Sequence, residues 1–539
     1  MRYYWRMHRR TFLTLSAACG LSACLPRLPW QLPPVSVLRP GMEMGHRLRD
    51  GVPAPDPARE RQVEVAILGS GVAGLFAGWR LAQQGFQDFC VLAGPEAHGN
   101  AAAGSLGGIG CPRGAHYLPL PSRESAHVRE MLAEFGILQG NPQADRPVYD
   151  ETALVHAPEE RLLIGGVWQA GLVPQHGLDA TEQAQCQRFI ATLQSLSTAR
   201  GQDGRKAFAM PLARSSRDPA FRQLDTERFA DWLTREGFTG NAVRWYANYC
   251  CRDDYGAGID EVSAWAGIHY FASRAGQAAN AEDGSVLTWP EGLHALTRRM
   301  FEAIGARRIQ QGTALSVAAR GKGVDVVCLE ASGQSSFLLR AKRVILAMPL
   351  HVAARIHDLS AYGFVRERDQ PPHAAWMVSN FLLDGFPVER SVQQPLAWDN
   401  VVYGGVGLGW VVATHQWLRL ARPAQTVFTA YHAFSGQAPN AVRSQMLNAT
   451  PEALLDVAGQ DLRAAYGDDF ERRVVQAEIS LRGHAMAIPT PGFLSRPGID
   501  ALRHADGAIL FAHADLSGLS VFEEASNQGD RAARKILGA

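Results

Sequence analysis

The chain has 539 residues, with 53 basic (Lys and Arg) and 52 acidic residues, so its formal net charge is +1. Hydrophobic residues make up 46% and charged residues 19%, which excludes a largely disordered chain. The length exceeds what one hydrophobic core usually supports, so at least two domains are expected. The balanced charge gives no basis for a nucleic-acid partner.

The first 23 residues have the pattern of an export signal. Arg2, Arg6, Arg9 and Arg10 occur without any acid, and a short, weakly apolar run ends in Leu21-Ser22-Ala23-Cys24. This arrangement is typical of a signal peptide, and the run is too short for a good membrane span. Residues 8–13 resemble a twin-arginine signal and residues 21–24 resemble a lipobox, which predicts a lipid on Cys24 at the periplasmic face of a bacterial membrane. The alternative is an ordinary signal with an incidental cysteine and a soluble periplasmic protein.

Residues 24–61 are predicted to form a proline-rich tether. Eight prolines fall between residues 25 and 57, with almost no periodic pattern. That composition favours an extended spacer between the membrane surface and the folded body. Cleavage before Cys24 would leave 516 residues, with 49 basic and 52 acidic side chains and a net charge of −3.

A dinucleotide-binding motif follows the tether. Residues 63–68 are typical of a buried strand, Gly69-Ser70-Gly71-Val72-Ala73-Gly74 comes directly after it, and residues 75–84 have helical apolar spacing. Residues 89–92 are predicted to form a second strand. Glycines at a strand-to-helix junction let backbone N–H groups approach a pyrophosphate, so Gly69, Gly71 and Gly74 are predicted to bind one.

The acidic residue that usually binds the adenosine ribose is missing from the end of the second strand. Ala93 holds that position, and Glu96 is the next acid along the chain. Glu96 either replaces the missing carboxylate from the loop or is a solvated loop charge.

Four later segments accompany the motif. They are the glycine-rich residues 99–114, which continue into His116 and Tyr117, the Trp-Pro-Glu-Gly segment 289–292, the apolar run 344–349 and residues 508–533. In this order and spacing they resemble the flavin amine oxidase superfamily, which includes monoamine and polyamine oxidases, protoporphyrinogen oxidase and phytoene desaturase. The resemblance covers residues 62–539. It implies an α/β fold with a discontinuous, Rossmann-like FAD-binding domain of the GR2 type and an inserted mixed α+β substrate domain.

The resemblance also implies domain boundaries and cofactor contacts. The FAD-binding domain would comprise residues 62–121, 281–349 and 500–539, and the substrate domain residues 122–280 and 350–499. Val317 would lie by the adenine and Asp515 would contact the ribityl chain. The segment Gly114, Ala115 and His116 would pass the isoalloxazine, and Val521, Phe522 and Glu523 would begin the last helix, whose positive end stabilises negative charge. No histidine or cysteine stands out as a covalent anchor, so noncovalent FAD is expected.

Three activities remain open at this point. Hydride removal is the chemistry of the cofactor, so a dedicated acid–base residue is not required. Many amine oxidases hold a water on a lysine near the flavin, but this chain has no lysine between Lys342 and Lys535. Oxidation of an amine C–N bond is favoured, with a small-molecule substrate and O2, a quinone or a carrier as electron acceptor. The alternatives are a desaturase- or protoporphyrinogen-oxidase-like dehydrogenase of an apolar substrate and a non-catalytic flavin-binding protein.

Several side chains are candidates for the substrate site. His116 is the catalytic candidate because free histidine titrates near neutrality, and a structural histidine is the alternative. Trp289, His484 and Tyr431 are predicted to line the substrate pocket, with core packing as the alternative for Trp289. An aromatic pocket or a sheet core would equally explain the remaining aromatic residues, Trp398, Tyr403, Trp410 and Trp417.

The cysteines do not predict a metal site. The eight cysteines include no CxxC pair and no Cys/His cluster at zinc spacing. Cys250 and Cys251 are adjacent and are expected to be two buried thiols rather than a disulfide. The uncharged residues 400–418 contain many glycines and are expected to supply two sheet strands, 401–403 and 410–412, rather than a membrane span.

Overall fold

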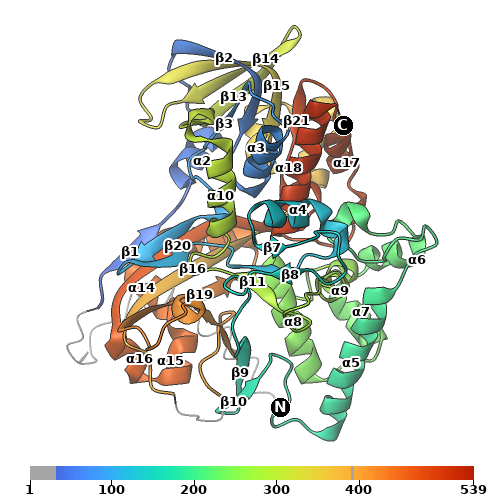
Figure 1. The fold of residues 1–539 in the computed structure, drawn as a ribbon, viewed down its shortest axis with the longest axis vertical. Coiled ribbons are helices and arrows are strands. Elements are labelled where there is room, and N and C mark those ends of the chain that lie inside the picture. The colour runs from blue at the N-terminus through green and yellow to red at the C-terminus, as the bar shows by residue number, and fades with distance from the viewer. Residues whose placement is uncertain (1–31, 390–393, 539) are drawn as a thin grey trace.

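The computed structural model describes residues 32–389 and 394–538, so the predicted export signal and Cys24 lie outside the described residues. Two large sheets organise this part of the chain, one of seven strands and one of eight (Figure 1). The seven-stranded sheet is at the top of Figure 1, and the eight-stranded sheet lies below it. Within the described ranges, no helix is long and apolar enough to cross a membrane.

The seven-stranded sheet contains the predicted dinucleotide-binding motif, and the half of the molecule around it is called the nucleotide-binding half below. Its strands are β2 (Pro57–Leu68), β3 (Phe89–Leu92), β12 (Ile309–Gln310), β13 (Thr313–Arg320), β14 (Gly323–Leu329), β15 (Ser336–Leu346) and β21 (Ile509–Phe511). β2 pairs in parallel with β3 and β15, and β15 pairs in parallel with β21. Parallel strands are covered on both faces, which explains the apolar runs that predicted them.

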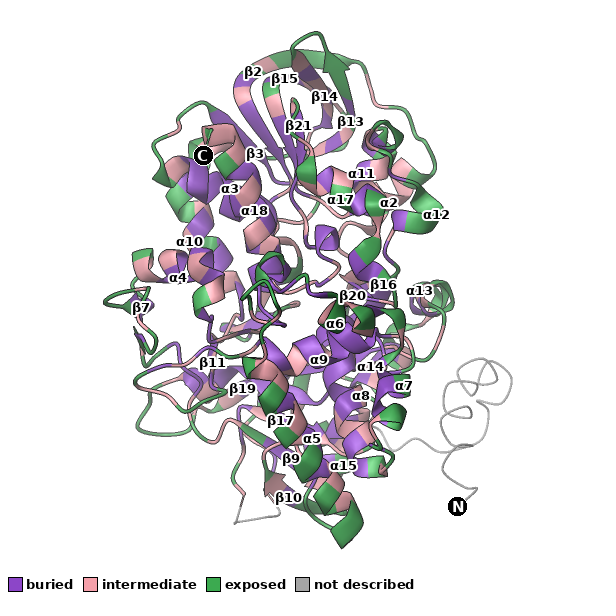
Figure 2. Cartoon of the chain, turned by 90° about the vertical axis from the view of Figure 1, so that its right-hand side faces the viewer, coloured by how far each residue is buried: buried purple, intermediate pink, exposed green. Residues whose placement is uncertain are grey.

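Helices cover both faces of this sheet. One face packs against α3 (Val72–Gln83), α10 (His294–Ile304) and α18 (Phe522–Leu537), and the other against α11 (Leu350–Ile356) and α17 (Pro497–His504). The predicted helix after the glycine motif is therefore α3, and the predicted last helix is α18. Figure 2 shows the buried residues concentrated along the strands and along the helix faces that cover them.

The eight-stranded sheet forms the other half. In spatial order its strands are β1 (Val35–Leu38), β20 (Val474–Ala487), β16 (His373–Asp384), β19 (Gln425–Ala433), β18 (Trp410–Val412), β17 (Asp399–Val402), β9 (Glu160–Ile164) and β10 (Val167–Ala170). One face packs against α5 (Ala180–Thr198), α7 (Phe229–Arg235), α8 (Asn241–Tyr255) and α9 (Ala264–Ala272). The other face packs against α13 (Pro439–Asn448), α14 (Pro451–Ala458), α15 (Gln460–Tyr466) and α16 (Asp468–Arg473). The uncharged run 400–418 supplies β17 and β18, as expected.

The predicted tether is wrong for residues 35–61. β1 pairs in parallel with β20, with Val35 opposite Ala477 and Leu38 opposite Ser480. Helix α2 (Met42–Arg49) follows and contacts α11, and β2 begins at Pro57. The strand is only four residues long and pairs with residues far along the chain, so local composition did not reveal it. The other domain boundaries stay predictions.

All six cysteines in the described ranges are free and buried, including Cys250 and Cys251 on α8. This agrees with the expectation of two buried thiols.

Candidate functional site

A cavity is lined by residues from both halves of the molecule. Its empty volume is about 830 Å³. The segment 114–117, the end of α8, strands β16 and β20 and the start of α18 contribute side chains. The lining residues used below are Gly114, Ala115, His116, Tyr117, Met210, Asp253, Asp254, Arg274, Leu293, Trp376, Val378, Tyr431, Arg482, Met486, Val521, Phe522 and Glu523.

The glycine motif lies at the junction between β2 and α3. Gly71 is the N-cap of α3 and no side chain caps the helix, so its first N–H groups lack the usual partner. A methyl group added at Gly74 would lie 1.9 Å from the Gly69 carbonyl oxygen, whereas one added at Gly71 would meet nothing within 4 Å. The junction is therefore packed where the helix meets the strand and open beside Gly71. An open, uncapped helix start is suited to a pyrophosphate.

The start of α18 provides a second uncapped helix N-terminus, at the cavity itself. Val521 is the N-cap without a side-chain partner, and Val521, Phe522 and Glu523 all line the cavity. The positive end of this helix can stabilise negative charge on a bound group. The structure thus brings these three predicted residues together beside the segment 114–116.

The segment 114–116 is held tightly against its neighbours. The Ala115 N–H donates to the Asn100 carbonyl oxygen at 2.8 Å, and the Tyr431 hydroxyl donates to the Gly114 carbonyl oxygen at 3.1 Å. The His116 ring stacks on Tyr431 with centroids 4.3 Å apart. Gly114, Ala115, His116 and Tyr431 therefore share the cavity, and their roles toward a cofactor or substrate stay predictions.

His116 does not have the acid–base property expected from the sequence. Burial lowers its pKa to about 3, so the ring is neutral at pH 7. Tyr117, Trp398 and Tyr431 surround the ring with aromatic rather than acidic groups. The expectation that His116 switches charge near neutrality is wrong, because burial disfavours the imidazolium.

Glu96 is neither a solvated loop charge nor an unpartnered acid. Its two carboxylate oxygens each accept from Arg482 at 2.9 Å, and the Arg482 Nε donates to the Arg113 carbonyl oxygen at 2.7 Å. Arg482 is itself a cavity residue. The ion pair therefore connects the loop after β3 to β20, and contact between Glu96 and a ribose stays a prediction.

Asp515 lies in a cluster of histidines outside the cavity lining. It is 2% exposed, and its carboxylate accepts from the Leu350 N–H at 2.8 Å and from His373 Nε2 at 3.0 Å. Burial alone would raise its pKa, but His373 and His513 outweigh this and hold the pKa of Asp515 well below its usual value. Its predicted contact with a ribityl chain stays a prediction.

The sequence did not predict this histidine cluster. Ligand atoms of His351 on α11, His373 on β16 and Asp515 after β21 lie within 4.8 Å of one another. The ring of His484 stacks on His351 at 4.5 Å and does not line the cavity, so its predicted place in the substrate pocket is wrong. The neighbouring Met486 lines the cavity instead, at the irregularity where the pairing of β20 with β16 shifts register between Arg482 and Met486.

Two further candidates lie away from the cavity lining. Val317 is on β13, and its carbonyl oxygen accepts from His357 Nδ1 at 3.1 Å, so its adenine contact stays a prediction. Trp289 packs against the hydrophobic core beside α3 and α10 and does not line the cavity. The core alternative holds for Trp289. It also holds for Tyr403, Trp410 and Trp417, so of the aromatic residues proposed for a pocket only Tyr431 lines the cavity.

The cavity contains Asp253 and Asp254, which the sequence did not predict, together with Glu523, which it placed at the start of the last helix. Burial raises the pKa of Asp253 to about 6, and the Tyr117 hydroxyl donates to its Oδ2 at 3.1 Å. Glu523 is 1% exposed, its Oε1 has no hydrogen-bond partner in the described structure, and burial raises its pKa to about 7. Arg274 forms an ion pair with Asp254 at 2.5 Å, so the positive charge of Arg274 is neutralised by Asp254 rather than by Asp253 or Glu523.

For Asp253 and Asp254 the only signal in the sequence is their position next to a segment predicted to be helical. Asp253 and Asp254 follow the aromatic residues of α8 and the adjacent cysteines. Which face of α8 reaches the cavity depends on its packing against β16 and β19, which no local pattern encodes.

Comparison with known proteins supports the fold. Residues 67–135 match the model of the NAD(P)-binding Rossmann-like domain. No curated protein sequence matches the chain. A wild-type putrescine oxidase structure with bound putrescine is 18% identical, with a TM-score of 0.63 over 89% of this chain and 100% of that one. The chain has the fold of this oxidase.

Other solved structures share the same fold. Cyclohexylamine oxidase from Brevibacterium oxydans is 18% identical, with a TM-score of 0.61 over 89% of this chain and 99% of that one. A fatty acid isomerase from P. acnes that produces CLA is 16% identical, with a TM-score of 0.58 over 87% of this chain and 97% of that one. The predicted fold class is therefore confirmed along most of the chain, including both sheets.

Proposed function

We propose that the chain is an FAD-dependent oxidoreductase that oxidises an amine C–N bond by hydride transfer to noncovalent FAD. The observation that carries this proposal is the pair of carboxyl groups, Asp253 and Glu523, that face an aromatic-lined cavity at the start of α18. Among the described residues, neither forms an ion pair, so each is available to a cationic ligand. Two solved structures of the same fold are a putrescine oxidase and a cyclohexylamine oxidase, which supports this choice.

The residues present fit a flavin dinucleotide. Gly69, Gly71 and the uncapped start of α3 would hold the pyrophosphate, and the segment 114–116 with the start of α18 would hold the ring system. The cofactor, when bound, supplies the hydride acceptor. The positive end of α18 would stabilise negative charge on the bound ring system.

The chain itself orients the amine and moves its proton. A protonated amine cannot release a hydride from its α-carbon readily, so the ammonium group must first lose a proton. Asp253 is the anionic group that positions the ammonium, since its pKa of about 6 keeps it charged at neutral pH. Glu523, with a pKa of about 7, can accept the proton at the same pH. Trp376, Tyr431 and Met486 exclude water from this place.

An apolar substrate is the second candidate function. Met210, Leu293 and Val378 also line the cavity, and no lysine is among its lining residues in the described structure. A solved structure of the same fold is a fatty acid isomerase. Dehydrogenation of an apolar, desaturase-type substrate would use the same flavin position and would not need Asp253.

Flavin spectroscopy tests both candidates. The purified protein should be yellow, with flavin absorbance near about 450 nm, and colourless protein that FAD does not reconstitute would refute the proposal. Anaerobic addition of monoamines, polyamines and apolar polyenes separates the substrate classes by which of them bleaches the flavin. If none of a broad panel bleaches it, the chain is a non-catalytic flavin-binding protein. Reoxidation by O2 or by a quinone then identifies the acceptor.

We also propose that the chain is exported and anchored by a lipid on Cys24. The charged start, the short apolar run and the Leu-Ser-Ala-Cys sequence support this. Metabolic palmitate labelling that disappears in Cys24→Ala is the expected result. Labelling that survives the substitution would refute lipidation at this residue, and an unlabelled wild type would favour a soluble periplasmic protein.

A further inference from the structure

One end of the eight-stranded sheet carries a group of exposed apolar side chains. β16 ends at Asp384 opposite Gln425, the first residue of β19, and Leu383 lies opposite Val474, the first residue of β20. β1 begins beside the same end, because Val35 lies opposite Ala477. Figure 1 shows these four neighbouring strands together. This end of the sheet is called the sheet tip below.

The segments that leave the sheet tip expose large apolar residues to solvent. Leu418 and Leu420, in the loop that leads into β19, are 75% and 110% exposed. The other exposed apolar residues of the tip are Leu32, before β1, Val388, after β16, and Val475, the second residue of β20. Single exposed apolar residues are common, but several from different segments at one end mark an interaction surface.

Basic side chains accompany these leucines. The Arg419 guanidinium lies over the Trp417 ring at 4.0 Å, and the Arg422 guanidinium lies over the Phe386 ring at 5.3 Å. Both arginines are exposed. Aromatic rings, leucines and arginines in one loop suit the boundary between lipid headgroups and acyl chains, where apolar side chains insert and guanidinium groups meet phosphates.

The position of the first described residue points to the partner. The described chain starts at Leu32, at the sheet tip, and Cys24 is only eight residues upstream. Eight residues span at most about 28 Å when fully extended. A lipid on Cys24 would therefore keep the sheet tip within about 28 Å of the bilayer.

We propose that the sheet tip is a membrane-contact surface, with Leu418 and Leu420 inserting at the interface of an anionic bilayer and Arg419 and Arg422 meeting lipid phosphates. This surface is separate from the cavity and independent of the proposed oxidase activity. It gives the protein a fixed orientation, with β1 and the loop before β19 toward the lipid.

Vesicle binding by the full chain carrying Cys24→Ser tests the proposal without the contribution of the lipid anchor. Co-sedimentation is measured with vesicles of pure phosphatidylcholine and with vesicles containing phosphatidylglycerol. The expected result is binding to the anionic vesicles that falls at least about tenfold in L418D/L420D, because two apolar side chains no longer insert. The matched control is Leu447→Asp on α13. This helix lies away from the sheet tip, because its Arg443 donates to the carbonyl oxygen of His373, at the opposite end of β16.

Three results would overturn the proposal. The first is no binding of the parent protein to anionic vesicles, and the second is equal binding by L418D/L420D and Leu447→Asp. The third is a change in oligomeric state of L418D/L420D on gel filtration with vesicle binding unchanged, which would assign the surface to contact between copies of the chain. The flavin spectrum of each variant confirms that it is folded, and Arg419→Glu with Arg422→Glu gives a second test through the anionic-lipid dependence alone.

Discussion

At the scale of single residues, the cavity is defined by carboxyl groups in different surroundings. Asp253 receives one hydrogen bond from Tyr117, while Glu523 is buried with one oxygen unpartnered. Glu524, the next residue, lies fully buried outside the cavity lining, and its Oε1 accepts from the Leu212 N–H. Burial raises the pKa of all three, so their charge states change within the physiological range.

Asp253→Asn should raise the KM for amines about ten- to a hundred-fold, because the ammonium loses its charged partner. The pKa of Asp253 is about 6, so protonation below that pH removes the negative charge. Amine affinity of the wild type should therefore be constant above pH 7 and weaken below pH 6, and this weakening should disappear in the variant. Steady-state kinetics from pH 5 to 8 measure both effects, and Asp260→Asn, at an exposed position, is the control. An unchanged KM in Asp253→Asn would favour the apolar-substrate function.

Glu524→Gln should reduce the pH dependence of stability. The pKa of Glu524 is raised by burial from 4.5 to about 7, so between these values the folded protein binds more protons than the unfolded chain. The stabilising contribution is thus fully present below about pH 4.5 and is lost as pH rises through about 7, with a magnitude on the order of 3 kcal/mol. Urea unfolding at pH 5 and pH 8 measures the difference. If the variant loses as much stability as the wild type over this range, Glu524 is not the group responsible.

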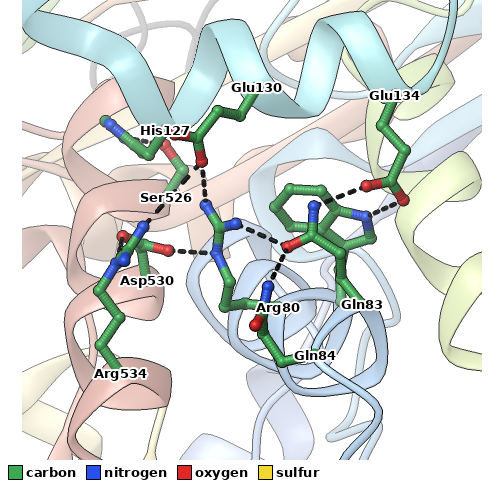
Figure 3. Close-up of polar contacts among 10 residues, drawn as sticks. Arg80, Gln83, Gln84, His127, Glu130, Glu134, Ser526, Asp530 and Arg534 are labelled. Atoms are coloured by element: carbon green, nitrogen blue, oxygen red, sulfur yellow. Dashed lines mark hydrogen bonds and ion pairs between the residues drawn. The ribbon is translucent and has the colours of Figure 1, made fainter. Parts of the chain in front are cut away.

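At the scale of elements, α3 contributes to both binding and packing. Its first turn is open for a phosphate, and its later residues pack against α18 and α10. Arg80, 4% exposed, connects three helices (Figure 3). Its guanidinium donates to Asp530 on α18 at 2.5 Å and to Glu130 on α4 (Ala126–Glu134) at 2.8 Å. Helices α3, α4 and α18 are therefore joined by an ionic network centred on the buried Arg80 side chain.

Gly71→Ala should leave the fold intact and abolish flavin binding. An added methyl group meets no protein atom within 4 Å, so it projects into the space that the pyrophosphate would occupy. The bound flavin per chain, measured by absorbance after purification, should fall at least about tenfold while the circular dichroism spectrum is unchanged. Gly45→Ala on α2, which also has nothing within 4 Å, is the control and should retain flavin. Full flavin content in Gly71→Ala would place the cofactor elsewhere.

Asp530→Ala should lower the free energy of unfolding by about 3 kcal/mol, because it leaves the buried Arg80 with only part of its compensating charge. Breaking the exposed pair between Arg298 and Glu302, 2.8 Å apart, with Glu302→Ala should change it by less than about 0.5 kcal/mol. Denaturant unfolding compares the two. Equal effects would mean that the network does not stabilise the packing of α3 against α18.

At the scale of the whole molecule, the cavity depends on both sheets being correctly placed. The Arg113–Glu478 pair, at 2.6 Å, and the Arg482–Glu96 pair, at 2.9 Å, connect loops of the nucleotide-binding half to β20. A ligand that binds only this assembled form stabilises the folded state by mass action. A bound cofactor should therefore stabilise the folded state in which the two halves are packed together.

Removal of FAD should lower the unfolding temperature, and adding it back at 100 times its Kd should restore about 2.7 kcal/mol. Differential scanning fluorimetry of the stripped and reconstituted protein measures the change. Gly71→Ala should show no rise on addition of FAD. A rise in that variant equal to the wild type would mean that the effect does not come from the pyrophosphate site.

The sequence predicted the features that are encoded locally. The apolar parallel strands, the glycine motif and the start of the last helix all lie where expected, because each rests on a short continuous pattern. The features that it missed depend on distant partners. β1 pairs with β20, which lies more than 400 residues further along the chain. Asp253 lines the cavity because of how α8 packs. His484 stacks on His351 and so belongs to the histidine cluster of α11, β16 and β20. Contacts of this kind follow from the assembled sheets rather than from spacing.

β1 also shortens the free edge of the sheet. It covers β20 from Ala477 to Ser480, where the N–H and C=O groups of β20 would otherwise be free to pair with another chain. A shortened form that starts at residue 62, where the resemblance places the first domain, would lack this strand. Such a form should aggregate even though every residue of the cavity is retained, so the preparation of soluble protein for crystallisation has to begin before Val35.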